Sequence, residues 1–235
     1  MFTFDRKVTY SEVSADNKVS AAQIVRYFQD CSIMQSESLG VGVDYLAQQH
    51  KVWLLASWQI RFLRRPKLGE MLHTCTWPYA FETIYGYRNF TLQDSQGEYL
   101  AYANSIWVLV DTQTGRFEKL TPADVEAYEK NEKFPMDYAP RKIRLPKEWE
   151  KQEDFAVTRA DIDTNGHVNN ARYVDMAFEY LDEGKEPVQL RVEYRKAAVF
   201  GNRIYPKVHR EENRITVALC DQAGQVYVPV EIETA

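Results

Sequence analysis

Residues 161–170 read DIDTNGHVNN and stand directly before a segment with helical periodicity. Acidic and amide side chains alternate at the start of this stretch, and an imidazole and two asparagines close it. The segment that follows, Asn170–Leu181, places one stripe of residues on a single side of a helix: Tyr173, Val174, Ala177, Phe178 and Leu181. An asparagine just ahead of a helix is a favourable N-cap. We therefore expect a polar turn that leads directly into a buried helix.

The start of this stretch also looks like the opening of an EF-hand calcium loop. Such a loop needs a bidentate glutamate at its twelfth position. Counted from Asp161, that position is Arg172, whose positive charge would repel the ion. The run before the loop, DFAVT at 154–158, reads as a strand and not as the helix that an EF-hand requires. We therefore expect no metal here.

Strand-like runs follow the helix. They are VQLRVEY at 188–194, RIYPKVH at 203–209, RITVALCD at 214–221 and QVYVPVEIE at 225–233. Pro229 has no N–H to donate to a neighbouring strand. We therefore expect the last run to contain an edge or an irregular stretch.

The first half of the chain has the same order of expected elements. Thr3–Tyr10 reads as a short strand, and a helix begins near Val19 and can close at Gly40. The buried stripe of this helix would be Ala21, Ile24, Val25, Phe28 and Cys31. Four strand-like runs then follow, at 52–62, 71–77, 84–92 and 99–111.

Individual positions of the two halves also match. The pair Lys18-Val19 corresponds to His167-Val168, and the turn at 94–97 corresponds to the turn at 221–224. The spacing between matching positions shrinks along the chain, as expected if the second copy has shorter loops. We therefore predict an internal duplication.

The alignment separates the two copies by their chemistry. Asp163, Asn165 and His167 of the second copy correspond to the first-copy residues Ser14, Asp16 and Lys18. An acid and an imidazole can move protons near neutral pH, whereas the first set has no imidazole. We therefore expect the catalytic residues in the second copy, and we expect the first copy to act as a scaffold or to line the substrate site.

Residues 118–152 differ from both copies. They contain four prolines among many charged residues and one short helical possibility at Pro122–Lys130. We expect a connector that crosses the surface. The predicted organisation is an N-terminal copy at 1–117, a linker at 118–152 and a C-terminal copy at 153–235.

The bulk composition is that of an ordinary globular protein, with 45% hydrophobic and 27% charged residues among 235. A net charge of −5 gives no support for nucleic acid or a membrane surface as a partner. Three cysteines without ligand-like spacing favour a reducing, cytoplasmic location. We expect no membrane-spanning segment, and the start MFTFDRKVTY has no signal-peptide pattern.

The pattern D-x-N-x-HVNN and the run EYRK at Glu193–Lys196 resemble the acyl-acyl carrier protein thioesterases of plants and bacteria. The resemblance covers nearly the whole chain. It implies an α+β fold, a tandem double hotdog in which two long helices are each wrapped by an antiparallel sheet. It also implies that the N-terminal copy binds substrate with a degenerate site and that the C-terminal copy is catalytic.

The resemblance further implies the activity, which is hydrolysis of fatty acyl-acyl carrier protein to free fatty acid and carrier. Asp163, Asn165 and His167 fall on the family's catalytic aspartate, asparagine and histidine. No cofactor and no metal are implied. The partner would be the acyl carrier protein, and the enzyme would be a monomer or a homodimer. Ala197 and Ala198 depart from the family, because many members have a glutamate and plant members a cysteine at these places.

Hydrolysis of a thioester needs an activated water and a stabilised oxyanion. The first turn of the helix near Asn170 offers unpaired N–H groups for the oxyanion. His167 is the preferred general base, Asp163 can orient the imidazole or the water, and Asn165 can hold the water. Either Asp163 or His167 could remove the proton. A cysteine nucleophile is disfavoured because no cysteine lies near this stretch.

Two alternatives remain open, namely a coenzyme A thioesterase of the same fold and a non-catalytic acyl-binding protein. An acyl carrier protein is acidic, so a basic surface would steer it toward the enzyme. Two basic runs could form such a surface: Arg61, Arg64, Arg65 and Lys67, and Arg141, Lys142, Arg144 and Lys147.

Overall fold

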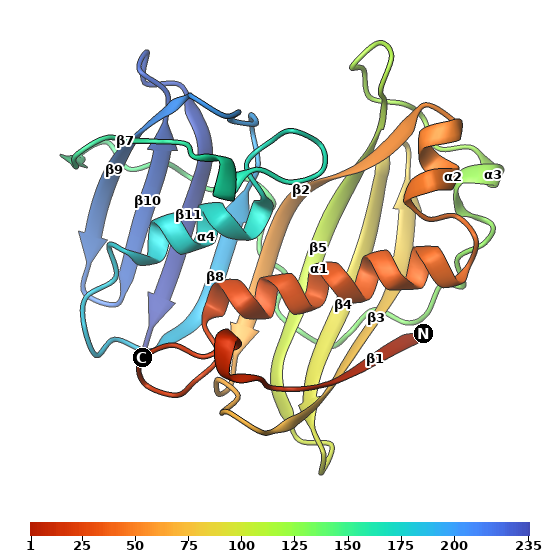
Figure 1. Ribbon diagram of the computed structural model, residues 1–235, viewed down its shortest axis with the longest axis horizontal. Coiled ribbons are helices and arrows are strands. Elements are labelled where there is room, and N and C mark those ends of the chain that lie inside the picture. The colour runs from red at the N-terminus through yellow and green to blue at the C-terminus, as the bar shows by residue number, and fades with distance from the viewer. The chain divides into compact units, whose positions relative to one another are not determined.

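The computed structural model describes all 235 residues (Figure 1). The chain forms two compact units. The first contains residues 1–56 and 60–138, and the second contains residues 57–59 and 139–235. Residues 118–138 of the expected linker therefore belong to the first unit, and residues 139–152 belong to the second.

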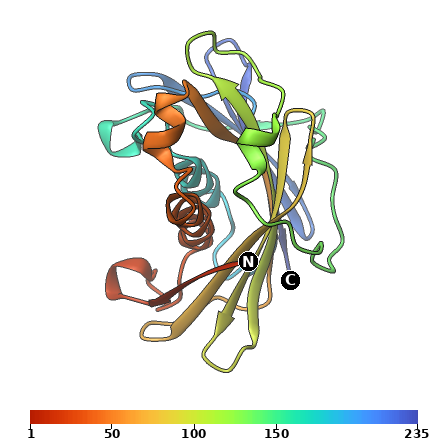
Figure 2. The same ribbon diagram turned by 90° about the vertical axis from the view of Figure 1, so that its right-hand side faces the viewer.

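The first unit combines one long helix with an antiparallel sheet. Its elements are β1 (Phe2–Lys7), a 3-10 turn (Tyr10–Glu12), α1 (Ala21–Ser38), α2 (Val43–Gln48), β2 (Lys51–Phe62), β3 (Met71–Glu82), β4 (Tyr85–Asp94), β5 (Tyr99–Asp111) and α3 (Pro122–Val125). Its strands lie in the order β1-β3-β4-β5-β2. Figure 2 shows α1 against one face of these strands.

Helix α1 begins and ends at local signals in the sequence. The hydroxyl of Ser20 accepts a hydrogen bond from the N–H of Gln23 at 3.1 Å, which is an N-cap. After Ser38 the chain turns at Gly40, whose φ of 72° suits a residue without a side chain. The predicted stripe from Ala21 to Cys31 is fully buried. Its Phe28 packs on Phe90 of β4, with ring centroids 5.2 Å apart.

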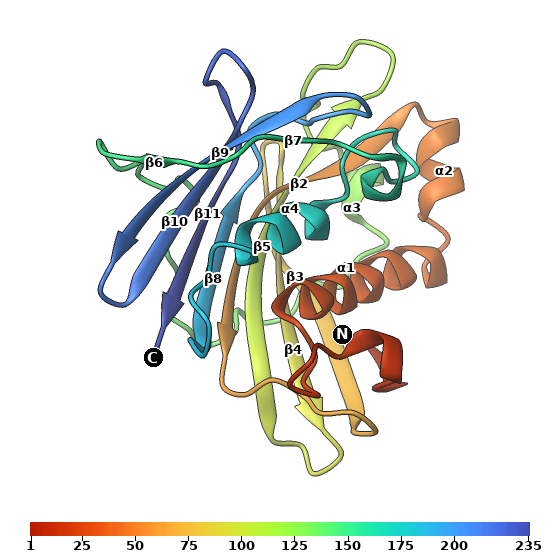
Figure 3. The same cartoon turned by 60° about the vertical axis from the view of Figure 1, so that its left-hand side comes forward.

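The second unit repeats this arrangement with shorter elements. They are β6 (Glu150–Lys151), β7 (Phe155–Ala156), a 3-10 turn (Arg159–Asp161), α4 (Asn170–Phe178), β8 (Pro187–Glu193), β9 (Arg203–Glu211), β10 (Arg214–Cys220) and β11 (Val226–Thr234). The strand order is β8-β11-β10-β9-β6, and β7 also pairs with β9. Helix α4 packs on β10 and β11 (Figure 3).

The predicted stripe of α4 is buried in its first part, at Tyr173, Val174 and Ala177. On the opposing strand β11, Val228, Val230 and Ile232 have no exposed surface, and the intervening Pro229 and Glu231 are buried as well. Because the side chains of a strand alternate between its faces, these three form the floor on which the helix rests. The prediction of two helix-and-sheet copies is therefore confirmed.

Pro229 lies in a central strand and not at an edge. It is paired with Ala218 of β10, but the ladder between β11 and β8 begins one residue later, at Val230 and Val192. The hydrogen bonding is therefore irregular at the residue that lacks an N–H, which is the second of the two possibilities that the sequence left open.

Several boundaries differ from the sequence-based expectation. Strand β3 continues to Glu82, because a register shift at Pro78 accommodates the proline. Helix α2 was not predicted, and α3 is a single turn that ends at Val125. The strand expected at 154–158 is reduced to Phe155–Ala156, since the chain then turns into a 3-10 helix.

None of the helices is both long enough and apolar enough to cross a membrane.

Candidate active site

The three predicted site residues lie on one tight turn of the second unit. Ile162 and Val168 form an antiparallel bridge at its base. Within the turn the N–H of Asp163 donates to the carbonyl of His167 at 2.8 Å, and the N–H of Gly166 donates to the carbonyl of Asp163 at 3.0 Å. Gly166 has a φ of 77°, which favours glycine. The fold therefore holds the acid, the amide and the imidazole on five consecutive residues.

The side chain of Asp163 supports the turn that carries it. Its Oδ1 accepts hydrogen bonds from the N–H of Asn165 at 2.8 Å and, more weakly, from the N–H of His167 at 3.4 Å. This is the local bonding that is typical of an aspartate in a turn. The other carboxylate oxygen makes no hydrogen bond within the protein and is free to bind water or an imidazole.

His167 and Asn165 differ in their surroundings. The backbone of His167 pairs with Val199 in an isolated bridge, and its side chain is half-buried. Asn165 is exposed at the tip of the turn. Of the other histidines, His73 bonds to Asp5 at 2.8 Å and His209 bonds to the carbonyl of Glu148 at 3.0 Å. The imidazole of His167 has no such partner in the protein.

Asp161 anchors the turn to helix α4. It is 4% exposed, and its Oδ1 accepts hydrogen bonds from Nε and Nη2 of Arg172 at 2.9 and 2.8 Å. Its other oxygen accepts from the N–H and the hydroxyl of Thr158. Burial would raise the pKa of Asp161, but the bonds from Thr158 and Arg172 outweigh it and hold the pKa below the ordinary value. This network fixes the helix against the turn.

Helix α4 begins directly after the turn. The side chain of Asn169 accepts a hydrogen bond from the N–H of Ala171 at 2.9 Å, as the sequence predicted for an N-cap. The N–H of Arg172 donates to the carbonyl of Asn169 at 2.9 Å. The N–H of Asn170 remains without a bond at this positive end of the helix, so it is available to an oxyanion.

Two tyrosines that sequence reasoning assigned to the core and to a strand support the site. The hydroxyl of Tyr173 accepts the N–H of Ala198 at 2.8 Å, and the hydroxyl of Tyr194 donates to the carbonyl of Asn170 at 3.1 Å. Burial raises the pKa of Tyr173 to about 12, against the lowering effect of the hydrogen bond from the N–H of Ala198. These bonds connect the loop after β8 to α4, which periodicity alone could not reveal.

The departures at 197 and 198 lie in the loop after β8. Ala198 is buried and its carbonyl accepts the N–H of Val168 at 2.9 Å, whereas Ala197 is exposed. Glu193 is 4% exposed and turns toward a different segment, where its Oε2 accepts the N–H of Ile143 at 3.0 Å and Nη2 of Arg195 at 2.7 Å. Glu193 is thus bonded to the segment at Ile143 and not to the turn that carries His167.

The first unit contains the same turn without the same side chains. Val13 and Val19 form the bridge, the N–H of Ser14 donates to the carbonyl of Lys18 at 2.9 Å, and Asn17 takes the place of Gly166 with a φ of 58°. The predicted duplication is therefore visible in individual backbone hydrogen bonds. The first copy has a lysine where the second has His167.

The family models account for both copies. The model of the acyl-ACP thioesterase N-terminal domain matches residues 1–128, which is more than half of the chain, and that of the C-terminal domain matches residues 145–235. The chain belongs to the acyl-ACP thioesterase family.

Known relatives agree with this membership. An acyl-[acyl-carrier-protein] hydrolase of Cuphea viscosissima is 26% identical over 205 residues, which make up 79% of this chain and 49% of that protein. The chain spans about half the length of the curated relatives it matches.

Solved structures establish the fold. An acyl-ACP thioesterase from Bacteroides thetaiotaomicron superposes with a TM-score of 0.91 at 20% identity, over 99% of this chain and 97% of that one. A 12:0-ACP thioesterase from Umbellularia californica gives a TM-score of 0.86 at 20% identity, over 99% and 97%. The predicted tandem hotdog fold is confirmed.

The two basic runs of the chain, at 61–67 and 141–147, differ in how many of their side chains form ion pairs. Arg64 bonds to Glu70 at 2.8 Å and to Asp94 at 3.1 Å, and Arg65 bonds to Asp16. The exposed residues of the second run, Lys142, Arg144 and Lys147, make no ion pair. The first run therefore offers less free charge to a carrier protein than its sequence suggests.

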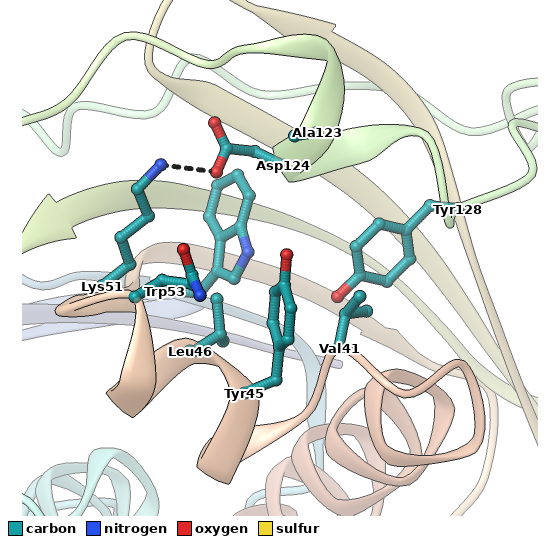
Figure 4. A pocket seen from close by; sticks show the side chains of 9 residues that line it. Val41, Tyr45, Leu46, Lys51, Trp53, Ala123, Asp124 and Tyr128 are labelled. Atoms are coloured by element: carbon teal, nitrogen blue, oxygen red, sulfur yellow. Dashed lines mark hydrogen bonds and ion pairs between the residues drawn. The ribbon is translucent and has the colours of Figure 1, made fainter.

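A small cavity of about 60 Å³ lies in the first unit of the chain (Figure 4). Its walls include Tyr45, Leu46, Trp53 and Tyr128. An ion pair between Lys51 and Asp124, at 2.7 Å, closes one side of it. The cavity is thus lined mainly by aromatic and aliphatic side chains, which suits an apolar group.

Proposed function

We propose that this chain is a thiolester hydrolase that releases free fatty acid from fatty acyl-acyl carrier protein and so ends fatty acid synthesis. The observation that carries the proposal is the match of both family domain models, in order, along the chain. The division of roles between the copies supports it, since only the second copy has an imidazole on the shared turn.

In the proposed reaction His167 accepts a proton from the water that attacks the thioester carbonyl carbon. When the tetrahedral intermediate collapses, the C–S bond breaks, and the protonated imidazole returns the proton to the thiolate of the carrier's arm. The free oxygen of Asp163 orients that water or the imidazole, while its bonded oxygen holds the turn in shape. Asn165, exposed at the tip, holds the water or the carrier's arm without titrating. The pH dependence of kcat in variants of Asp163 and His167 tests which of the two residues removes the proton.

The oxyanion of the tetrahedral intermediate would accept a hydrogen bond from the N–H of Asn170, which has no other partner at the start of α4. A preorganised donor of this kind contributes about 3–4 kcal/mol to transition-state stabilisation where one has been removed by mutation. The anchor between Asp161 and Arg172 fixes the direction of this N–H, because it ties the first turn of the helix to the preceding loop.

The first unit is proposed to bind the acyl chain. The aromatic side chains of Trp53 and Tyr128 in the wall of its small cavity support this role. No cofactor enters the proposal. We further propose a cytoplasmic enzyme, in line with three free cysteines, that is complete as a monomer or a homodimer.

The decisive experiment compares His167→Ala with Lys18→Ala, which changes the matching position of the first copy. Release of free thiol from acyl-carrier substrates of increasing chain length is measured for both. The first variant should lose at least two orders of magnitude in kcat, the scale of a lost general base, while the second keeps its activity. Near-normal turnover by His167→Ala would remove this residue from the mechanism.

The same assay with matched coenzyme A esters tests the substrate. A higher kcat/KM for the carrier-bound ester supports the proposal, and a preference for the coenzyme A ester supports the other hotdog activity. Tight acyl binding without thiol release by the unmodified chain would instead show a binding protein.

A further inference from the structure

An exposed aromatic and a cation lie beside the turn that carries His167. Val199, which pairs with His167, is 41% exposed, and the next residue, Phe200, is 53% exposed. The guanidinium carbon of Arg159 stands 4.6 Å from the centre of the Phe200 ring. We call Arg159, Val199 and Phe200 the Arg159–Phe200 patch.

The charge of Arg159 is not neutralised within the protein. Its side chain is exposed and makes no hydrogen bond or ion pair with an acid. Other basic residues of this region are paired, since Arg172 binds Asp161, Arg203 binds Asp154 and Lys196 binds Asp221. Arg159 is therefore a cation that a partner can use.

The geometry of the patch suits protein recognition. Stacking on Phe200 holds the guanidinium in place, and the edges that carry its N–H groups stay open to a carboxylate. Arginine and aromatic residues are the types that contribute most to protein interfaces. The small residues Ala160 and Ala197 are exposed nearby in sequence and leave room for an approaching surface.

We propose that the Arg159–Phe200 patch is the docking surface for the acidic acyl carrier protein. This rests on the proposed function. A carrier protein presents its acyl group on a flexible arm, so it must dock where the arm can reach His167, and Val199 lies directly opposite that residue. Because the chain has a net charge of −5, an acidic partner needs a local cation at the point of contact.

The matching place in the first unit lacks the guanidinium but not positive charge, because the bridge that corresponds to His167 and Val199 joins Lys18 and Lys67 there. The duplication aligns Tyr10 with Arg159 and Leu68 with Phe200, and these two are 81% and 45% exposed. Both units thus expose apolar side chains here, but only the unit with the imidazole has an arginine at the position of Arg159. The arginine beside an exposed aromatic ring, and not positive charge as such, therefore distinguishes the unit that carries the candidate catalytic turn.

The free cations of the second basic run lie elsewhere on the same unit. The backbone of segment 140–144 is held by Arg191, Glu193 and Arg195, which share one face of β8 and its extension. The neighbours Leu190 and Val192 face the core instead. Lys142 and Arg144 therefore serve as matched controls that carry the same charge away from the turn.

The test compares Arg159→Glu and Phe200→Ala with Arg144→Glu. Binding of fluorescently labelled holo-carrier protein, which carries no acyl group, is measured by anisotropy. The kcat/KM for an acyl-carrier substrate is measured beside that for an acyl-pantetheine thioester of the same chain length, which has neither protein nor nucleotide. Thermal melting confirms that each variant is folded.

We expect Arg159→Glu to weaken carrier binding and to raise KM for the carrier substrate by about tenfold. Phe200→Ala should weaken binding several-fold, and Arg144→Glu should change little. Hydrolysis of acyl-pantetheine should be unchanged in all three. Carrier binding by Arg159→Glu at the original strength, or equal losses in Arg159→Glu and Arg144→Glu, would overturn the proposal.

The binding arm separates this proposal from the proposed function. If the unmodified chain hydrolyses neither substrate but Arg159→Glu still loses carrier binding, the docking surface stands and the hydrolase assignment fails. If the unmodified chain hydrolyses acyl-pantetheine and the carrier binds independently of Arg159 and Phe200, the hydrolase assignment stands and the docking surface fails.

Discussion

The carboxylate of Asp161 accepts two hydrogen bonds from the guanidinium of Arg172, at 2.9 and 2.8 Å, across the start of helix α4. These are the first and twelfth residues of the stretch that looked like a calcium loop. Arg172, whose charge would repel a calcium ion at this place, instead forms an ion pair with Asp161. The result is a helix whose first turn is fixed to the loop that carries His167.

Replacing Asp161 with asparagine should destabilise the second unit. The variant leaves Arg172 and Thr158 with a weaker acceptor at a buried position, which costs about 1–3 kcal/mol. Because the pKa of Asp161 is lowered in the folded state, its contribution is present above the ordinary aspartate range and is lost as the pH falls through the folded-state value. The stability gap between wild type and Asp161→Asn should therefore be widest near neutral pH and narrow on acidification.

Urea denaturation across the acidic range measures this gap. Glu212→Gln is the control, since it removes one negative charge from an exposed residue without a partner. A gap that does not depend on pH, or one of equal size in the control, would contradict the role given to Asp161.

The N-cap of α4 can be tested against its counterpart in the first copy. Asn169→Ala and Ser20→Ala each remove a side chain that accepts a helix N–H, at 2.9 and 3.1 Å. Each should cost about 1 kcal/mol of stability. Only Asn169→Ala should also lower kcat, because only α4 directs an N–H toward the proposed oxyanion. Equal stability losses with equal activities would argue that the start of α4 has no part in the chemistry.

Helices α1 and α4 and the longer strands were predictable because they bury apolar residues at regular positions. The stripe from Ala21 to Cys31 and the alternation from Val228 to Ile232 record that burial directly in the sequence. The turn at 163–167 was predictable because its bonds join residues that are close in the chain. The duplication added a second instance of each pattern.

The partners of buried polar residues were not predictable in the same way. The parity of a strand places Glu193 on a face, but it does not state that the face is covered by Ile143, fifty residues earlier. Likewise nothing in the periodicity of β3 anticipates that a register shift absorbs Pro78. Such features depend on contacts between distant segments, which a local pattern does not encode.

Gly166 offers a third prediction, because its φ of 77° is unfavourable for most side chains. A Cβ at this position would meet no atom within 4 Å, so the cost of a substitution comes from the backbone alone. Gly166→Ala should lose about 1–2 kcal/mol. Gly166→Asn should lose clearly less, since Asn17 adopts the same conformation in the first copy and asparagine tolerates it. Equal denaturation midpoints for the two variants would contradict this account.

The clamp formed by Glu193 gives the last prediction. Glu193→Ala leaves the buried N–H of Ile143 and the guanidinium of Arg195 without their acceptor, which should cost about 1–3 kcal/mol. The freed segment should then be cut by trypsin after Lys142 and Arg144 several-fold faster than in the wild type. Limited proteolysis followed by mass spectrometry locates these cuts.

Because Glu193 faces this segment and not the turn, Glu193→Ala should keep the kcat of the wild type at temperatures where it stays folded. The exposed Glu212→Ala variant is the control for proteolysis and should be cut at the wild-type rate. A large fall in kcat with an intact segment at 140–147 would mean that Glu193 supplies the carboxylate that Ala197 lacks. Faster cleavage with unchanged kcat would instead assign the EYRK run of this chain to holding the connector, and would leave the chemistry to the turn at 163–167.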